Sequence, residues 1–141
     1  MTYLLDTCVI SEFTRRQPNE RVVRWLSKTD EETLYLSVLS IGEIRHGIER
    51  LEDSPRKEDL RHWLENDLIL RFDKRILPLD IHVLLIWGEL VGGLERKGRK
   101  VPALDGLIAA TALANDLVIV TRNTVDFAPC GVRLFNPWEE R

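Results

Sequence analysis

Short apolar segments alternate with segments of helical periodicity along this chain, and that alternation restricts its fold more than any other feature. Residues 3–5 and 117–120 are short uncharged runs typical of buried strands. Residues 33–37 and 132–135 predict two more strands, and residues 76–79 a brief strand or connector. Strands that alternate with helices favour a mostly parallel sheet. We therefore expect an α/β fold, a three-layer α/β/α sandwich with a mostly parallel central sheet.

The predicted helices have apolar residues at the three-to-four spacing of a helix packed on one face. Pro18 and Pro55 precede two of them, where proline favours a helix start. The predicted helices are 19–28, 41–51, a charged helix after Pro55, about 81–95, and 104–115. No repeat, low-complexity tract or linker marks a second domain, so residues 1–141 are expected to form a single domain.

Bulk composition excludes several classes of protein. The net charge of −3 argues against a nucleic-acid binder with a wholly basic surface, although a local basic patch can accompany an acidic site. No apolar run approaches the roughly 20 residues that span a bilayer, and no secretory signal opens the chain, so we expect a cytoplasmic protein. Cys8 and Cys130 are expected to be free thiols in that compartment.

Polar residues occur where several predicted strands end or where the adjoining helices begin. Ligands of parallel sheets bind beyond the carboxyl ends of the strands, so these side chains are expected to meet at one edge. One follows the first strand, one lies early in the helix after the second strand, and one opens the helix before the strongest strand. Two more come after that strand. The residues in these positions are Asp6, Glu43, Asp105, Asn123 and Asp126.

Each acid also has a purely structural interpretation. Asp6 could cap a helix that begins near Thr7. Glu43 and Asp105 could be favourable first-turn acids, and Asp126 a solvated turn residue. However, Glu43 and Asp105 have apolar neighbours, and acids at a core boundary need a further reason.

Electrostatics supplies that reason. Two carboxylates about 4 Å apart repel by roughly 4 kcal/mol at an effective dielectric constant of about 20. Clustered acids must therefore take up protons or bind a cation. An all-oxygen ligand set suits Mg²⁺ or Mn²⁺, and such an ion can activate water and bind phosphate. The sequence thus predicts metal-dependent hydrolysis of a phosphodiester.

Four segments in order resemble the acid-bearing segments of PIN-domain nucleases. They are residues 4–12, 36–44, 105–112 and 120–127, and together they place the resemblance over essentially the whole chain. Within that family the chain is most similar to the VapC toxins of prokaryotic toxin–antitoxin pairs. The ending Phe-Asn-Pro-Trp, residues 135–138, is shared with one branch of them.

The resemblance implies a Mg²⁺- or Mn²⁺-dependent endoribonuclease with an RNA substrate. It also implies a homodimer, silenced by a VapB-type antitoxin that inserts a segment near the site. The implied metal ligands and core catalytic acids are Asp6, Glu43 and Asp105. Some relatives have an acid where this chain has Asn123, and others use a later acid, here Asp126, which we expect to assist catalysis.

Residues that neighbour these acids in the sequence are expected to have supporting roles. Ser40 and Thr121 are expected to be hydroxyl groups beside the ligands, and Arg122 is the strongest candidate for a phosphate contact. The alternative function is a catalytically silent PIN-like module that acts by binding RNA or a protein partner. A phosphotransfer protein is disfavoured because Asp6 lacks an acidic neighbour and no Lys follows the late strand.

Overall fold

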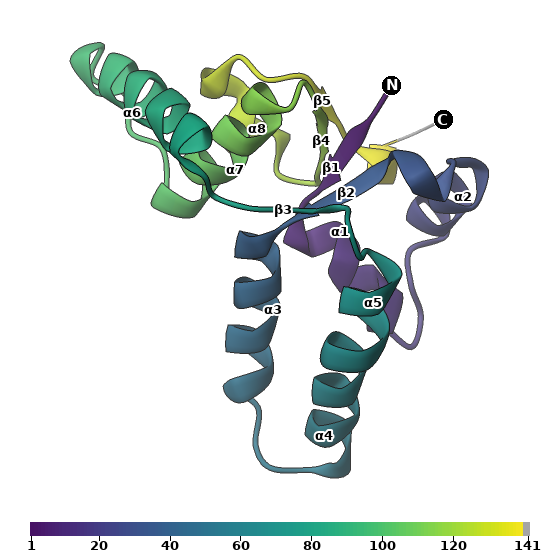
Figure 1. The fold of residues 1–141 in the computed structure, drawn as a ribbon. Coiled ribbons are helices and arrows are strands. Elements are labelled where there is room, and N and C mark those ends of the chain that lie inside the picture. The colour runs from purple at the N-terminus through teal and green to yellow at the C-terminus, as the bar shows by residue number, and fades with distance from the viewer. Residues whose placement is uncertain (140–141) are drawn as a thin grey trace.

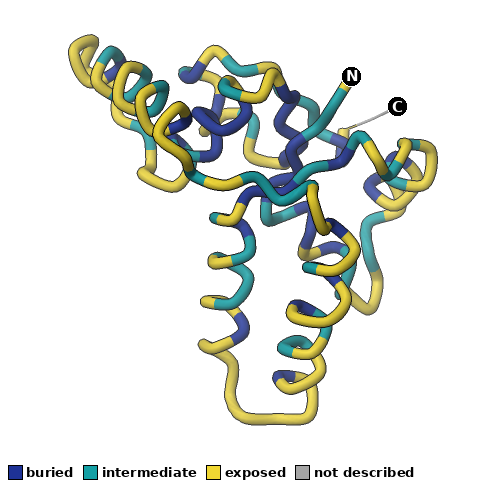
Figure 2. The backbone as a smooth tube through the Cα atoms, viewed as in Figure 1, coloured by how far each residue is buried: buried dark blue, intermediate teal, exposed yellow. Residues whose placement is uncertain are grey.

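Strand β1 (Tyr3–Leu5) lies at the centre of the sheet in the computed structural model, which describes residues 1–139. Leu4 and Leu5 are fully buried, and they face opposite sides of the sheet because side chains alternate along a strand. Leu5 joins an apolar cluster with Trp25, whereas Leu4 joins another with Phe127. Burial on both faces explains why this strand is apolar throughout. Figure 2 shows that the buried residues lie mainly at the centre of the fold.

Within residues 1–139 five parallel strands form one sheet, in the order β3-β2-β1-β4-β5. Leu4 pairs with Tyr35 on one side and with Ile119 on the other. The strand order therefore changes direction beside β1, which is where ligands bind in open α/β sheets. The other strands are β2 (Leu34–Ser37), β3 (Ile76–Leu77), β4 (Val118–Val120) and β5 (Leu134–Phe135).

Helices cover both faces of this sheet, so the predicted three-layer α/β/α fold is confirmed. Figure 1 shows α7 and α8 on one side, α1 on the other, and α3 and α4 extending away as a hairpin. The α-helices are α1 (Thr7–Ser11), α2 (Glu20–Lys28), α3 (Val38–Glu49), α4 (Pro55–His62), α5 (Ile69–Arg71), α6 (Ile81–Arg96), α7 (Ala103–Ala114) and α8 (Thr124–Phe127). The other turns are η1 (Glu12–Thr14), η2 (Glu31–Thr33), the π-helix η3 (Trp63–Leu68), η4 (Ala128–Cys130) and η5 (Pro137–Glu139).

The predicted long helices are confirmed, with shifted ends. The α2 helix begins after Asn19, whose side chain accepts hydrogen bonds from two backbone amides of the first turn. The helix after Pro55 continues through a π-helical turn into α5. Both cysteines are free thiols, as predicted. Among residues 1–139, the helices are all too short or too polar to cross a membrane.

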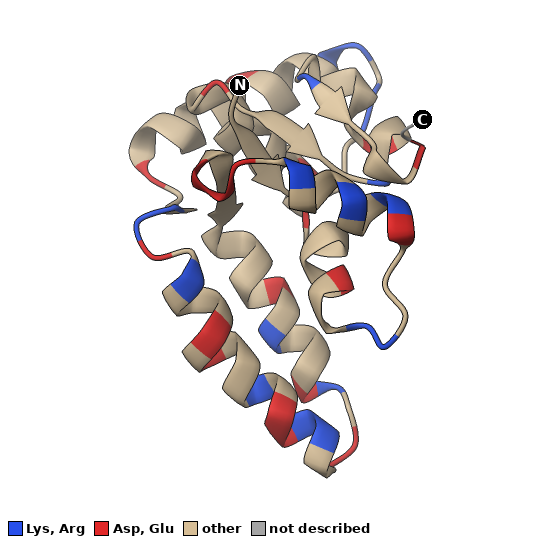
Figure 3. Cartoon of the chain, turned by 90° about the vertical axis from the view of Figure 1, so that its right-hand side faces the viewer, with Lys and Arg blue, Asp and Glu red and all other residues tan. Residues whose placement is uncertain are grey.

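Ion pairs tie α3 to the antiparallel chain of α4 and η3. Arg61 contacts Glu49 at 2.7 Å and Glu58 at 2.5 Å, and Arg45 contacts Glu49 at 3.0 Å and also pairs with Glu65. Figure 3 shows acidic and basic residues intermixed along this hairpin. Arg45 and Arg61 are therefore neutralised by neighbours and offer little free charge to an anionic ligand.

A buried lysine closes the turn of the same hairpin. The Lys57 ammonium donates to the carbonyl oxygens of Glu49 (3.2 Å) and Leu51 (2.9 Å) and to the carboxylate of Asp53 (3.3 Å). Lys57 is 6% exposed, whereas the Asp53 side chain is almost fully solvated. The carbonyl groups at the end of α3 thus accept hydrogen bonds from a side chain.

Lys57→Met should destabilise the folded chain by about 1–3 kcal/mol, because it removes the donor that the carbonyl groups of Glu49 and Leu51 share. Asp53→Ala is the matched control, since it removes only the exposed carboxylate, and it should cost less than about 0.5 kcal/mol. Urea unfolding measures both values. Equal losses would show that the ion pair, rather than the carbonyl contacts, holds the turn.

Candidate active site

Asp6 follows β1 directly and lies where β1 and β4 end together. Its backbone amide donates to the carbonyl of Val120 at 3.0 Å, which continues the pairing of the two strands. Its carboxylate is 7% exposed and is held at both oxygens, by the Thr7 amide at 2.9 Å and the Thr121 hydroxyl at 2.8 Å. Asp6 therefore caps α1, and the same geometry fixes its carboxylate at the sheet edge.

Thr7 connects this carboxylate to that of Glu43. While its amide contacts Asp6, its hydroxyl Oγ1 donates to Oε1 of Glu43 at 2.8 Å, across from α1 to α3. Thr7 is not among the site residues expected from the sequence. The available signal was its position directly after the strand-terminal acid, where a hydroxyl can reach a second acid.

Burial changes the pKa of the Asp6 carboxyl group. Removal from water raises the pKa of Asp6, and hydrogen bonds from Thr121, Thr7 and Cys8 oppose the shift. The donors therefore stabilise the negative charge that burial disfavours.

Asp105, in the first turn of α7, lies within the electrostatic field of the other acids. Burial is the largest cause that raises the pKa of Asp105 to about 6. The negative charges of Asp6, Asp126 and Glu43 add to the shift, in that order. Asp6, Asp126 and Glu43, from three other segments of the chain, therefore each lie within electrostatic range of Asp105.

The chemistry of these acids suits a divalent cation, but their side chains are too far apart in this structure to bind one ion together. Burial and the charges of the neighbouring acids raise the Asp105 pKa, and a bound cation would oppose both effects; all the ligand atoms of these acids are oxygens. Across residues 1–139, however, no three Asp, Glu, His or Cys side chains stand close enough together to hold an ion. Because Thr7 and Thr121 hold the Asp6 and Glu43 carboxylates, shared binding would require a change of side-chain orientation at another acid, such as Asp105.

The predicted supporting residues differ in how they meet this cluster. The Thr121 hydroxyl also accepts from the Asn123 amide at 3.0 Å, so it links Asp6 to the turn after β4. Ser40 is 1% exposed, lies one helical turn before Glu43, and its hydroxyl has no partner among the described residues. The exposed Asn123 makes no side-chain cap to α8. Arg122 is exposed and lies against an aromatic ring described below.

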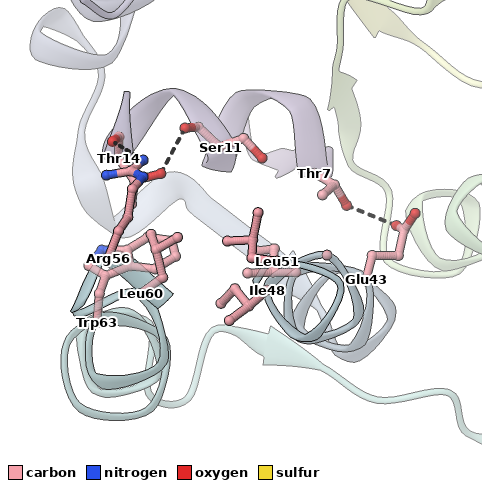
Figure 4. Close-up of a pocket in the computed structure, with 11 residues that line it drawn as sticks. Thr7, Ser11, Thr14, Glu43, Ile48, Leu51, Arg56, Leu60 and Trp63 are labelled. Atoms are coloured by element: carbon pink, nitrogen blue, oxygen red, sulfur yellow. Dashed lines mark hydrogen bonds between the residues drawn. The ribbon is translucent and has the colours of Figure 1, made fainter. Parts of the chain in front are cut away.

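A pocket of about 440 Å³ opens beside the acids, between α1 and the α3–α4 hairpin. Figure 4 shows Thr7 and Glu43 at one end and Arg56 near Thr14 at the other. The wall between the two ends is largely apolar and is formed by Ile44, Ile48, Leu51, Leu60 and Trp63. Glu43 thus belongs both to the acid cluster and to an apolar pocket.

A central parallel sheet with acids gathered beyond β1 and β4 defines the class of protein. The sequence model of the PIN domain matches residues 3–128, and the chain belongs to the PIN-domain family.

Two curated relatives cover nearly the whole chain. One is toxin FitB of Neisseria gonorrhoeae, 42% identical over 97% of this chain and 99% of the relative. The other is VapC ribonuclease Y4jK of Sinorhizobium fredii, 33% identical over 96% of this chain and 97% of the relative. The resemblance to PIN-domain proteins of the VapC group is therefore confirmed.

A solved structure shows the same fold. The crystal structure of FitAcB from Neisseria gonorrhoeae superposes with a TM-score of 0.93 at 41% identity, over 99% of this chain and all of that one. The sheet order and helix arrangement described above are therefore those of an experimentally determined relative.

Asp105→Asn should reduce the pH dependence of stability. The folded-state pKa of Asp105, about 6, lies above its ordinary value of 3.8, so the folded chain binds more protons than the unfolded chain between these values. Stability is therefore lost as pH rises through this window. Across this pH window the unfolding free energy of Asp105→Asn should fall by about 1 kcal/mol less than that of the parent. The difference is no larger because this carboxyl is partly solvated and its pKa shift is screened.

Urea unfolding in EDTA at the two ends of the window measures this difference. Asp67→Asn, an exposed site on η3, is the control and should behave as the parent. A parent-like slope for Asp105→Asn would contradict the predicted repulsion.

Proposed function

We propose that this chain is a Mg²⁺- or Mn²⁺-dependent endoribonuclease that acts as the toxin of a toxin–antitoxin pair. The observation that carries the proposal is the placement of Asp6, Glu43 and Asp126 around Asp105 at the switch point of the sheet, where burial first and the charges of those three acids second raise the Asp105 pKa to about 6. The names of the two curated relatives, a toxin and a ribonuclease, support the biological role and the substrate.

The ion would be held by Asp6, Glu43 and Asp105, with Asp126 at the outer side of the cluster. When bound, it would supply positive charge to the phosphate and lower the pKa of a water molecule. The chain's own contribution is orientation: Thr121 and Thr7 hold the two oxygens of Asp6, and Thr7 also holds Glu43. Fixed carboxylates need little reorganisation when the transition state forms.

Ser40 has a distinct part in this proposal. A buried hydroxyl without a partner costs free energy unless a ligand or water satisfies it. Because Ser40 and Glu43 are three residues apart on α3, they lie on the same helix face. We place the Ser40 hydroxyl beside the attacking water, where it can donate or accept a hydrogen bond.

Asp6→Asn should abolish RNA cleavage without unfolding the chain. Asn caps a helix as well as Asp does, so α1 keeps its start, but the charge needed to bind the cation is lost. Cys8→Ser is the control: its sulfur lies 3.9 Å from the Asp6 carboxylate, and its replacement keeps a donor there. Cleavage of a mixed RNA pool is measured with Mg²⁺, with Mn²⁺ and with EDTA.

Cleavage that requires both the metal and Asp6 would establish the nuclease. Equal rates for the parent and Asp6→Asn would contradict the carboxylate mechanism. A folded parent that binds RNA or a protein but never cuts, at any metal concentration, would favour the silent binding module.

We further propose that a segment of the cognate antitoxin occupies the pocket beside Glu43. The pocket is apolar along its walls and reaches the acid cluster at one end, so one segment could fill it and block the site. A positive charge near the far end, on Arg56, would suit an acidic group in that segment.

Leu51→Lys should weaken binding of the antitoxin at least tenfold and leave cleavage by the free toxin unchanged. Leu51 is 42% exposed and lines the pocket, so a lysine there keeps the fold but disturbs the apolar surface. Leu70→Lys is the control, because Leu70 is 68% exposed and lies outside the pocket. Titration calorimetry with the purified antitoxin measures the affinities, and equal values would refute this placement.

A homodimer is the assembly we propose for the toxin. The exposed apolar side chains of α6 support it, namely Ile81 (78% exposed), Leu85 (64%) and Leu84 (42%). Apolar side chains that gather on one exposed helix are typical of an interface.

A further inference from the structure

Arg122 lies against the ring of Trp138. Its guanidinium carbon is 4.5 Å from the centroid of the ring, within the range of a cation–π contact. Arg122 is exposed, whereas Trp138 is only 9% exposed. A buried ring that supports an exposed cation stabilises one orientation of a side chain that would otherwise sample many.

Trp138 is itself fixed by contacts with distant parts of the chain. Its amide donates to the Asn136 side chain at 2.9 Å, and its carbonyl accepts from Arg21 of α2 at 3.0 Å. Its side chain belongs to the same apolar cluster as Trp25. The ring therefore lies in a fixed place relative to the sheet.

This place is next to the acid cluster. The Thr121 amide donates to the carbonyl of Phe135 at 3.0 Å, so the segment that carries Trp138 runs beside the end of β4. Arg122 follows Thr121, whose hydroxyl contacts Asp6. Among residues 1–139 Arg122 forms no ion pair, which leaves its charge available to an anion.

We propose that Trp138 is a positioning residue that holds Arg122 ready to bind a phosphate of the RNA backbone beside the carboxylates. This rests on the proposed ribonuclease function. Stacking uses the face of the guanidinium, whereas its N–H donors point outward from the edge and remain free for bidentate contact with phosphate oxygens. The arrangement supplies one fixed positive charge next to a cluster of negative ones.

The test measures binding to a random-sequence single-stranded RNA pool, by fluorescence anisotropy over a range of salt concentrations. All variants are made in the Asp6→Asn chain, so that RNA is not cut. Arg122→Ala should weaken binding and lower the salt slope by about 0.7, the value for one lost phosphate contact on a single strand. Arg133→Ala, which removes a charge paired with Asp116, is the control and should change neither.

Trp138→Leu should weaken binding as much as Arg122→Ala does, whereas Trp138→Phe should restore most of the affinity. In a chain that already carries Arg122→Ala, Trp138→Leu should have no further effect. The Arg122 side-chain N–H resonance should be shifted by the ring in the parent and should lose that shift in Trp138→Leu. These readouts depend on the contact rather than on overall stability.

Two results would overturn the proposal. One is an Arg122→Ala chain with unchanged affinity and salt slope, a result that needs no folded Trp138 variant. The other is an equal loss from Trp138→Leu with and without Arg122. If the chain with its native Asp6 cuts RNA in either case, the ribonuclease function stands and only the role of Trp138 and Arg122 is wrong. A parent that neither binds nor cuts RNA would refute both.

Discussion

The parallel pairing of β1 with β4 is the constraint on which the site depends. It brings Asp6 and Thr121 together although 115 residues separate them in the chain, and a hydrogen bond of 2.8 Å joins their side chains. The carboxylate, its donors and the start of α1 follow from that pairing. Leu4 and Leu5 pack into different apolar clusters on the two faces of the sheet. A shift of the β1 register by one residue would therefore move each side chain to the opposite face. The core therefore sets the position of the acid.

The acids oppose the stability of the fold that carries them. Burial raises the pKa of Asp6, and burial together with the charges of the neighbouring acids raises that of Asp105, so the folded chain tolerates their negative charge only at a cost. Hydrogen bonds from Thr121 and Thr7 reduce this cost at Asp6. Such strain is typical of a site organised for a ligand of opposite charge.

Much of this could be predicted from the sequence. Uninterrupted apolar runs at residues 3–5 and 117–120 are typical of buried strands, and the acids that follow them mark the active edge of a parallel sheet. The role of Thr7 could not be predicted, because it depends on the distance between α1 and α3. The stacking of Arg122 on Trp138 likewise depends on where the last strand leaves the sheet. Short helices such as α8 were missed because four residues carry too little periodicity.

The boundary that Thr7 and Glu43 form between the acid cluster and the apolar pocket has an evolutionary consequence. A substitution there that changed catalysis would also reshape the place where we put the antitoxin segment. If the antitoxin segment binds there, substitutions at these two residues would affect both cleavage and inhibitor binding, so the two properties should evolve together. New specificity for a partner should instead accumulate along the apolar wall of the pocket, at residues such as Leu51 and Leu60, which catalysis does not constrain.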